Sequence, residues 1–105
     1  MPLNAGDTAP DFTVKDTNGN TVRLSDYAGQ MVVLYFYPKD DTPGCTKQAC
    51  SFRDNYTQYT SKNIPVFGVS MDDEASHQKF TEKFSLPFPL LADTDGAITK
   101  AYDVD

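Results

Sequence analysis

The sequence predicts an α/β domain with a mostly parallel central sheet, on three observations. Three short apolar runs rich in β-formers lie at residues 31–37, 64–71 and 88–92. Such runs are typical of strands covered on both faces, as in a parallel sheet. Two segments of helical periodicity, at 43–61 and 74–84, separate the three runs. The order strand, helix, strand, helix, strand implies right-handed crossovers and therefore parallel strands.

A β-hairpin is predicted before the first of these strands. Residues 11–15 alternate in polarity, and residues 21–24 can form the returning strand. Between them, residues 16–20 read DTNGN and contain the Asn-Gly pair that two-residue hairpin turns favour.

The helix predicted over residues 43–61 starts with good end signals. Thr42 is a favourable N-cap residue, and Pro43 follows at the first helical position, where its missing N–H costs nothing. One helical stripe carries the side chains expected to face the core: Cys45, Ala49, Phe52, Tyr56 and Tyr59.

Two further helices are predicted towards the end of the chain. Asp72 or Asp73 can cap a helix over residues 74–84, and another helix is expected from residue 97 to residue 102. The DTDG stretch at residues 93–96 has its glycine at the wrong offset for a calcium loop and lacks the closing glutamate, so it is predicted to be a turn.

Length and charge bound the classes of function. The 105 residues allow one domain, spanning 1–105, and the net charge of −6 disfavours nucleic acid and anionic membranes as partners. No apolar run approaches the ~18 residues of a membrane span, and the first residues do not resemble a signal peptide. A cytoplasmic location is therefore expected.

The stretch PKDDTPGCTKQAC holds both cysteines of the chain, Cys45 and Cys50. If the helix begins at Pro43, Cys45 lies in its first turn, beside backbone N–H groups that have no partner within the helix. Those donors and the helix dipole favour a negative charge on the sulfur and can bind a polar substrate oxygen. Asp40 and Asp41 are expected to oppose this effect by like-charge repulsion.

The spacing of Cys45 and Cys50 bears on how they can react. Residues five apart in an ideal helix have Cα atoms roughly 8–9 Å apart, whereas a disulfide needs Cα atoms within about 7 Å. A bond between these two thiols therefore requires the start of the helix to unwind. Two inert buried thiols and a zinc site with the distant His77 are alternatives, and zinc is the weakest because four ligands are wanted.

His77 is the only histidine of the chain. It shares a helical stripe with Phe80 and Phe84, which favours a hydrogen-bonded histidine at the edge of the core over a catalytic base.

Beyond these patterns, the sequence resembles the peroxiredoxins. Pro38-x-x-x-Thr42-x-x-Cys45 is similar to their active-site motif, and Cys50 five residues later resembles the peroxiredoxin Q subgroup, also called bacterioferritin comigratory protein. Further landmarks spread the resemblance over essentially the whole chain: Gly6-Asp7-x-Ala9-Pro10-Asp11-Phe12, Val33-x-Tyr35-Phe36-Tyr37-Pro38, Phe52-Arg53-Asp54, Val69-Ser70 and Phe88-Pro89-Leu90-Leu91-x-Asp93.

The resemblance implies a thioredoxin-like fold and a thiol peroxidase that reduces hydrogen peroxide and organic hydroperoxides without a metal or organic cofactor. It implies that Cys45 is the peroxidatic cysteine and that Cys50 resolves its sulfenic acid as an intramolecular disulfide. Thr42 and the backbone N–H groups of Gly44 and Cys45 would contact the peroxide, and Pro38 would shield the site from water. A thioredoxin-type protein would reduce the disulfide, and the family pattern implies a monomer.

The sequence departs from the family pattern at its end. The family's catalytic arginine, two strands and a helix have no counterpart, and the only arginines are Arg23 and Arg53. The strand at 31–37 would then have one unpaired edge, which favours pairing with another chain. The alternative function is therefore a catalytically silent domain that self-associates through this edge. A thioredoxin-type disulfide oxidoreductase is disfavoured because its cysteines form CxxC.

Overall fold

The computed structural model describes residues 4–104, so residues 1–3 and 105 of the predicted domain lie outside the described residues. The strands are β1 (Thr13–Lys15), β2 (Thr21–Arg23), β3 (Val33–Phe36), β4 (Val66–Ser70) and β5 (Leu90–Ala92). The helices are the 3₁₀ turn η1 (Leu24–Tyr27), α1 (Pro43–Asp54), α2 (Tyr56–Thr60), α3 (Glu74–Phe84) and α4 (Ala97–Ala101).

The main sheet is parallel, with strand order β3-β4-β5, and β1 pairs with β2 as an antiparallel hairpin. Strand β4 lies in the middle and is buried along its whole length. The predicted α/β class, the parallel pairing and the N-terminal hairpin are confirmed. The three strands are shorter than the apolar runs that predicted them, because the ends of those runs continue into loops.

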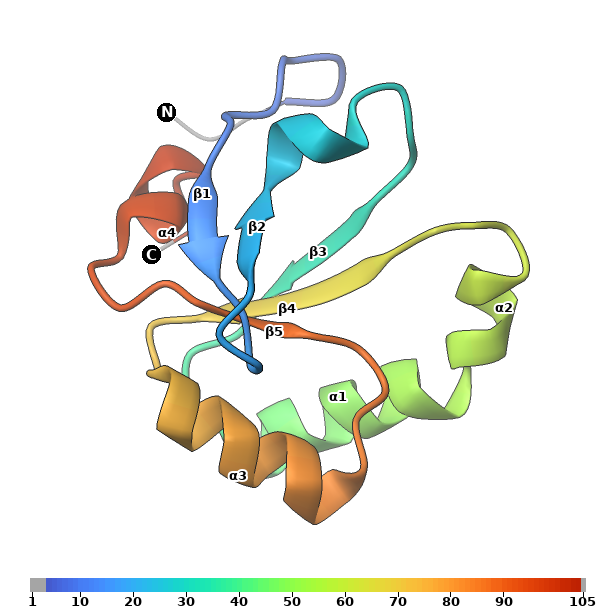
Figure 1. Ribbon diagram of the computed structural model, residues 1–105, viewed down its shortest axis with the longest axis vertical. Helices are drawn as coiled ribbons and strands as arrows, with labels where there is room; N and C mark the ends of the chain where they lie inside the picture. The colour runs from blue at the N-terminus through green and yellow to red at the C-terminus, as the bar shows by residue number, and fades with distance from the viewer. Residues whose placement is uncertain (1–3, 105) are drawn as a thin grey trace.

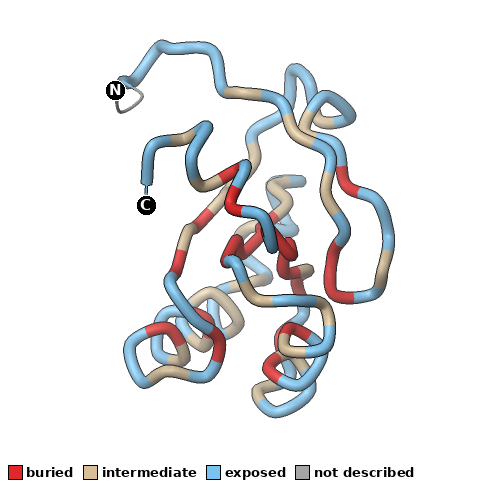
Figure 2. Tube along the Cα trace, turned by 90° about the vertical axis from the view of Figure 1, so that its left-hand side faces the viewer, coloured by how far each residue is buried: buried red, intermediate tan, exposed pale blue. Residues whose placement is uncertain are grey.

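Each face of the sheet is covered by a different set of elements. Helices α1, α2 and α3 lie on one face, while the hairpin, η1 and α4 lie on the other (Figure 1). Side chains of β3 alternate between the two cores: Tyr35 packs on the α1 side, where its ring stacks on Phe52 at 4.5 Å between centroids, and Leu34 packs on the hairpin side. The buried part of the chain is accordingly concentrated around the sheet (Figure 2). The domain therefore has three layers.

The helix predicted over residues 43–61 is interrupted at Asn55. This residue lies outside both α1 and α2, with φ −107° and ψ 11°, and its side-chain amide donates to the carbonyl of Ser51 at 2.8 Å. A side chain that bonds the backbone in this way competes with the helical ladder. The predicted stripe survives the break, because Phe52, Tyr56 and Tyr59 all pack against the core that contains Cys45.

The connection predicted over residues 16–20 lies between β1 and β2 as expected, but its turn is a three-residue loop and not the two-residue type that Asn-Gly favours. The backbone N–H of Asp16 donates to the carbonyl of Asn20 at 2.9 Å, and Gly19 adopts φ +77°. The Asp16 carboxylate accepts from the backbone N–H groups of Asn18 and Asn20, both at 2.9 Å, and so favours the longer loop.

The tip of this hairpin covers the outer edge of β5. Thr17 is buried and its hydroxyl accepts from the backbone N–H of Leu90 at 2.9 Å, while Asp16 forms an isolated bridge with Leu91. Strand β3 differs: within residues 4–104, no strand pairs with its other edge.

The later helices start as predicted. Helix α3 spans residues 74–84, and of the two candidate caps Asp73 is the one that accepts from the backbone N–H of Ser76, at 2.9 Å. The DTDG stretch forms the turn that leads into α4, with Gly96 at φ +72°.

Candidate active site

Cys45 lies in the first turn of α1, just beyond the loop that follows β3. Its side chain is 8% exposed and belongs to the core between α1 and the sheet, together with Tyr35 and Tyr37. The predicted position of Cys45 at a helix start is therefore confirmed.

The first turn of α1 is not capped by a side chain. Thr42 occupies the N-cap position with extended backbone, as predicted, but its hydroxyl donates to the carbonyl of Lys39 at 3.0 Å and makes no capping bond. Pro43 has no N–H, and the N–H of Thr46 already donates to the backbone carbonyl of Thr42 at 2.8 Å. Among residues 4–104, the N–H groups of Gly44 and Cys45 have no acceptor. Two donors beside the sulfur are thus open to a ligand.

Cys50 lies on the same helix, and both thiols are free. Cys50 is half-buried. Helix α1 is unbroken from Pro43 to Asp54, so both cysteines stand in one continuous helix. Ideal helical geometry then separates their Cα atoms by roughly 8–9 Å. A Cys45–Cys50 disulfide would therefore require the start of α1 to unwind.

Asp40 is buried and bonded to side chains rather than directed at the Cys45 helix. Its carboxylate accepts from the hydroxyl of Tyr37 at 2.6 Å and the hydroxyl of Ser76 at 2.8 Å, and lies 2.7 Å from Nδ1 of His77. Burial raises the pKa of Asp40, but the hydrogen bonds from His77, Tyr37 and Ser76 outweigh this and hold the pKa below its ordinary value.

Asp41 also has a cationic partner. Lys83 lies 2.8 Å from its carboxylate in an exposed ion pair. Both acidic residues that were expected to oppose a thiolate at Cys45 are therefore engaged by basic side chains, Asp40 by His77 and Asp41 by Lys83. No local sequence pattern indicates these pairs, because their members lie 37 and 42 positions apart.

The other predicted site residues lie around the same junction. Gly44 is exposed on the first turn of α1, and a side chain there would meet no atom within 4 Å. Pro38 is exposed on the loop and lines a hollow of about 340 Å³ with Tyr37, Met71 and Thr99 among others.

Neither arginine faces this site. Arg53 donates to the carbonyl of Phe84, the last residue of α3, at 2.7 Å. Arg23 is exposed on the hairpin. Arg53 thus has a structural partner on the helix that also carries His77.

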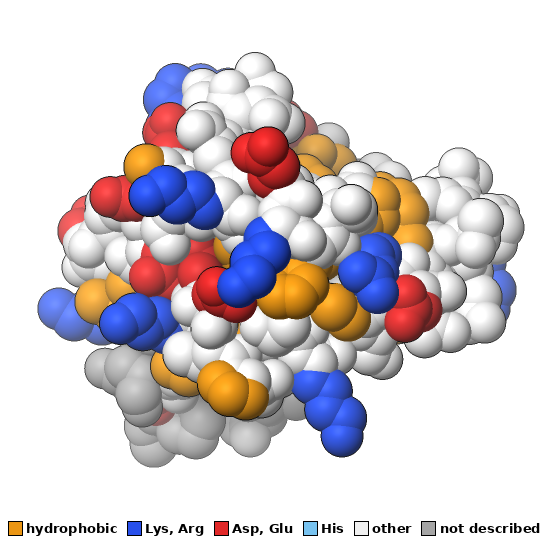
Figure 3. All heavy atoms as spheres, turned by 90° about the horizontal axis from the view of Figure 1, so that it is seen from below, with side chains coloured by type: hydrophobic (Ala, Val, Ile, Leu, Met, Phe, Trp, Pro, Cys, Tyr) orange, Lys and Arg blue, Asp and Glu red, His pale blue; other side chains and the backbone are white. Residues whose placement is uncertain are grey.

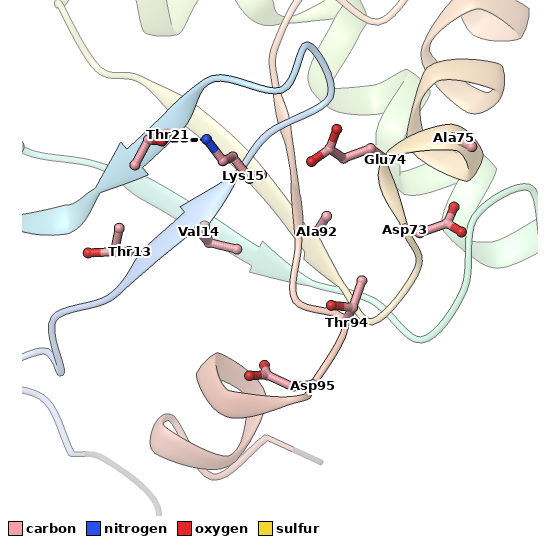
Figure 4. A pocket seen from close by; sticks show the side chains of 10 residues that line it. All are labelled: Thr13, Val14, Lys15, Thr21, Asp73, Glu74, Ala75, Ala92, Thr94 and Asp95. Carbon is pink, nitrogen blue, oxygen red and sulfur yellow. Dashed lines mark hydrogen bonds between the residues drawn. The ribbon is translucent and has the colours of Figure 1, made fainter.

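Two other hollows lie away from Cys45. One, of about 560 Å³, is lined by the hairpin, the start of α3 and the turn after β5, and the Lys15 ammonium donates to Thr21 there at 2.9 Å (Figure 4). Acidic side chains of Asp73, Glu74 and Asp95 surround it, but no group of three potential ligands among residues 4–104 could hold a metal ion. The other hollow, of about 730 Å³, is lined by Leu34 and Phe36 of β3, by η1 and the residues after it, and by Tyr102.

The surface charge is mixed where the molecule is seen from below, since basic and acidic side chains alternate around small hydrophobic areas (Figure 3). Within the part of the chain that the structure describes, no helix has the length and apolar character needed to cross a membrane.

Fold and site together define a class: a thioredoxin-like α/β domain with a buried thiol in the first turn of the helix after a parallel strand. Comparison with known proteins specifies the family. Residues 5–105 match the AhpC/TSA family. The chain belongs to this family, and its relatives place it with the peroxiredoxin Q and Bcp group.

Three relatives illustrate the match. The chain is 51% identical to peroxiredoxin Q, chloroplastic, of Triticum aestivum over 102 residues, which are 97% of this chain and 47% of the relative. It is 48% identical to peroxiredoxin Bcp of Bacillus subtilis (strain 168), covering 99% of this chain and 66% of that protein. The crystal structure of peroxidoxin BcpB from Mycobacterium tuberculosis superposes with a TM-score of 0.89 at 39% identity, over 94% of this chain and 65% of that one. The chain thus spans about half the length of its plant relatives.

Proposed function

We propose that this domain reduces hydrogen peroxide and organic hydroperoxides, with Cys45 as the peroxidatic cysteine. The observation that carries the proposal is the start of α1, where a buried thiol lies beside the unpaired N–H groups of Gly44 and Cys45. Donors of this kind stabilise the negative charge that develops on a peroxide oxygen as the O–O bond breaks.

In the first step the Cys45 thiolate attacks one oxygen of the hydroperoxide. An S–O bond forms and the O–O bond breaks; sulfur is oxidised by two electrons to a sulfenic acid, and the departing oxygen takes up a proton to leave as water or an alcohol. The Thr42 hydroxyl, now bonded to the carbonyl of Lys39, would turn to contact the peroxide. Pro38, on the same loop, would limit the access of water.

In the second step Cys50 resolves the sulfenic acid. Its sulfur attacks Cys45, water leaves, and an intramolecular disulfide forms. The first turns of α1 must unwind for this, because a continuous helix holds the two thiols too far apart. A thioredoxin-type dithiol protein would return both cysteines to thiols by exchange, which suits a reducing compartment such as the cytoplasm.

The test is peroxide consumption with a thioredoxin system, measured for this chain and for Cys45→Ser. We expect turnover with the native chain and none above background with the variant. Cys50→Ser should complete the first step but form no intramolecular disulfide. Equal turnover by the native chain and Cys45→Ser would refute the proposal.

A second candidate function is self-association through the β3 edge. Alternate residues of β3 bond to β4, for example Val33 to Pro65 at 2.9 Å, so the backbone groups of Leu34 and Phe36 face the other way. The mostly apolar hollow of about 730 Å³ is lined by Leu34 and Phe36 of the same strand. The mass of the chain in solution tests this proposal. A dimer supports association through the edge, and a monomer at all concentrations contradicts it.

A further inference from the structure

A buried polar network joins the loop before α1 to helix α3 and strand β5. At its centre is His77, whose side chain is 0% exposed. Its Nδ1 lies 2.7 Å from an Asp40 carboxylate oxygen, and its Nε2 lies 3.0 Å from the carbonyl oxygen of Leu91. The reaction proposed above uses none of these three groups.

The hydrogen bonds require a proton on each side of the His77 ring. The Leu91 carbonyl can only accept, so Nε2 carries a proton. One more proton lies between Nδ1 and Asp40. The Asp40 carboxylate already accepts from the hydroxyls of Tyr37 and Ser76, and both bonds stabilise its charged form. This second proton therefore belongs to the ring, and His77 is a buried imidazolium paired with a carboxylate.

The charges around the ring support this state. The groups that face it are Asp40 from the loop, Asp72 from the segment after β4 and the Leu91 carbonyl from β5. Burial lowers the pKa of His77, but the hydrogen bond and charge of Asp40, the Leu91 carbonyl and the charge of Asp72 together raise it above its ordinary value. Burial and the Asp40 carboxylate raise the pKa of Tyr37, so its hydroxyl stays protonated.

The same network fixes the loop that leads to Cys45. The backbone N–H of Asp40 donates to the Asp72 carboxylate at 2.8 Å, so Asp40 is held through both its side chain and its main chain. Asp41 follows with φ +57°, a conformation that non-glycine residues adopt rarely. The next residue is Thr42, the N-cap of α1. The position of the first turn of α1 therefore depends on where Asp40 is held.

We propose that His77 is a positioning residue for the reaction of Cys45. Its ion pair with Asp40 holds the loop in place, so that the open N–H groups of α1 meet the peroxide and the loop stays anchored when the first turn unwinds. The pair also keeps the Asp40 carboxylate away from those N–H groups. This inference rests on the proposed peroxidase function.

One measurement tests the ion pair without any activity. His77 is the only histidine, so its ring signals in a ¹⁵N NMR spectrum are unique. We expect both ring nitrogens to be protonated at pH 7 and to titrate above pH 6.5, the ordinary value. In Asp40→Asn, which keeps the side-chain size, the ring should titrate at lower pH. A neutral ring at pH 7 in the native chain would overturn the proposal.

A second measurement tests positioning. The rate at which Cys45 reacts with hydrogen peroxide is compared with its rate of alkylation by iodoacetamide, in the native chain, in His77→Gln and in the control Lys79→Ala on the exposed side of α3. We expect His77→Gln to slow the peroxide reaction roughly tenfold to hundredfold, because small misplacements of reacting groups have effects of this size. Alkylation and the control should stay close to native.

The pH profile adds a readout that a purely structural role would not move. The peroxide rate of the native chain should fall as pH rises through the His77 titration, whereas His77→Gln should show no such fall. If His77→Gln does not fold, Asp40→Asn replaces it: without the ion pair, its peroxide rate should be slow on both sides of the native His77 titration. The inference would be refuted if His77→Gln and Asp40→Asn, when folded, kept the peroxide rate and the pH profile of the native chain. A native chain no faster than its unfolded thiol would refute the peroxidase function, and the NMR result would still decide the ion pair.

Discussion

Two helices of this domain begin a few residues after strands of the same sheet, and their starts are completed differently. In α4, the buried carboxylate of Asp93 accepts from the backbone N–H groups of Ile98 at 3.0 Å and Thr99 at 2.9 Å. The side chain of Asp95 accepts from Ala97 at 3.0 Å. Carboxylates of the preceding turn therefore satisfy each free donor of this first turn.

In α1 the corresponding donors stay free. Thr42 turns its hydroxyl to Lys39, and Asp40 turns its carboxylate away from the helix, so Gly44 and Cys45 keep unpaired N–H groups. Residue type does not explain the difference, because both connections contain aspartate and threonine.

The two helix starts differ in the position of the groups that donate to the preceding aspartate, Asp93 before α4 and Asp40 before α1. Asp93 takes them five and six residues ahead, on the helix that it precedes, whereas Asp40 finds His77 37 residues away on α3. The comparison shows that the first-turn N–H groups of a helix can stay unpaired when the nearby carboxylate is bonded to a partner elsewhere in the fold. Closing α1 or opening α4 should therefore have opposite consequences.

The largest expected effect comes from closing the start of α1. Thr42→Asp removes the hydroxyl proposed to contact the peroxide and supplies a carboxylate that can accept from the N–H of Cys45, so we expect peroxide reactivity to fall about a hundredfold. Stability should rise by about 0.5–1 kcal/mol from the better cap and the helix dipole. Stopped-flow oxidation and urea denaturation measure the two quantities. A variant that is more stable and equally reactive would show that the open donors do not matter.

Opening the start of α4 should affect stability alone. Asp93→Ala leaves the N–H groups of Ile98 and Thr99 without their acceptor, so we expect a loss of about 2–3 kcal/mol in the free energy of unfolding. Urea denaturation checks this, with Asp95→Ala, an exposed residue of the same turn, as the milder control. The peroxide reactivity of Cys45 in the folded fraction of Asp93→Ala should equal that of the native chain. A loss of this reactivity would show that the start of α4 also affects the Cys45 site.

The ion pair that keeps α1 open should make stability depend on pH. The pKa of His77 is raised above 6.5, so its contribution is complete below pH 6.5 and is lost as pH rises through the folded-state value. The pKa of Asp40 is lowered below 3.8, so its contribution is present above pH 3.8 and is lost as pH falls through the folded-state value.

The stability advantage of the native chain over His77→Gln should therefore be greatest between pH 4 and pH 6.5, at about 1–3 kcal/mol, and should shrink at higher pH. Urea denaturation from pH 4 to well above pH 6.5 measures it. An advantage that does not shrink as pH rises above 6.5 would contradict a charged ring.

The smallest effect is expected at the exposed pair beside the same loop. Lys83→Ala removes the partner of Asp41, and exposed ion pairs contribute about 0–1 kcal/mol. We expect a change below ~0.5 kcal/mol, weaker still at high salt. A larger loss of peroxide reactivity than in His77→Gln would assign the anchoring of the loop to Asp41 instead of Asp40.

Sequence patterns predicted the local features of this fold well. Apolar runs located β3, β4 and β5, and end signals located α3 and the first turn of α1, because both kinds of pattern act over a few residues. The break at Asn55 and the hairpin loop built on Asp16 were missed, since each depends on a side chain that bonds the backbone nearby.

The candidate site was predicted only in part. Cys45 and Cys50 follow from helical spacing and motif, but the hydroxyl direction of Thr42 depends on the loop carbonyl of Lys39. The partnership of Asp40 and His77 joins residues 37 apart. Only the folded chain brings these two together, and no local pattern contains that information.

The most direct test of the account is the intact mass of the protein after one equivalent of peroxide. The open start of α1 should make Cys45 the reacting thiol, so the native chain should lose two hydrogens as the Cys45–Cys50 disulfide forms, and Cys50→Ser should gain one oxygen. Cys45→Ser should keep its mass. Unchanged mass in the native chain, or oxidation that persists in Cys45→Ser, would contradict the account.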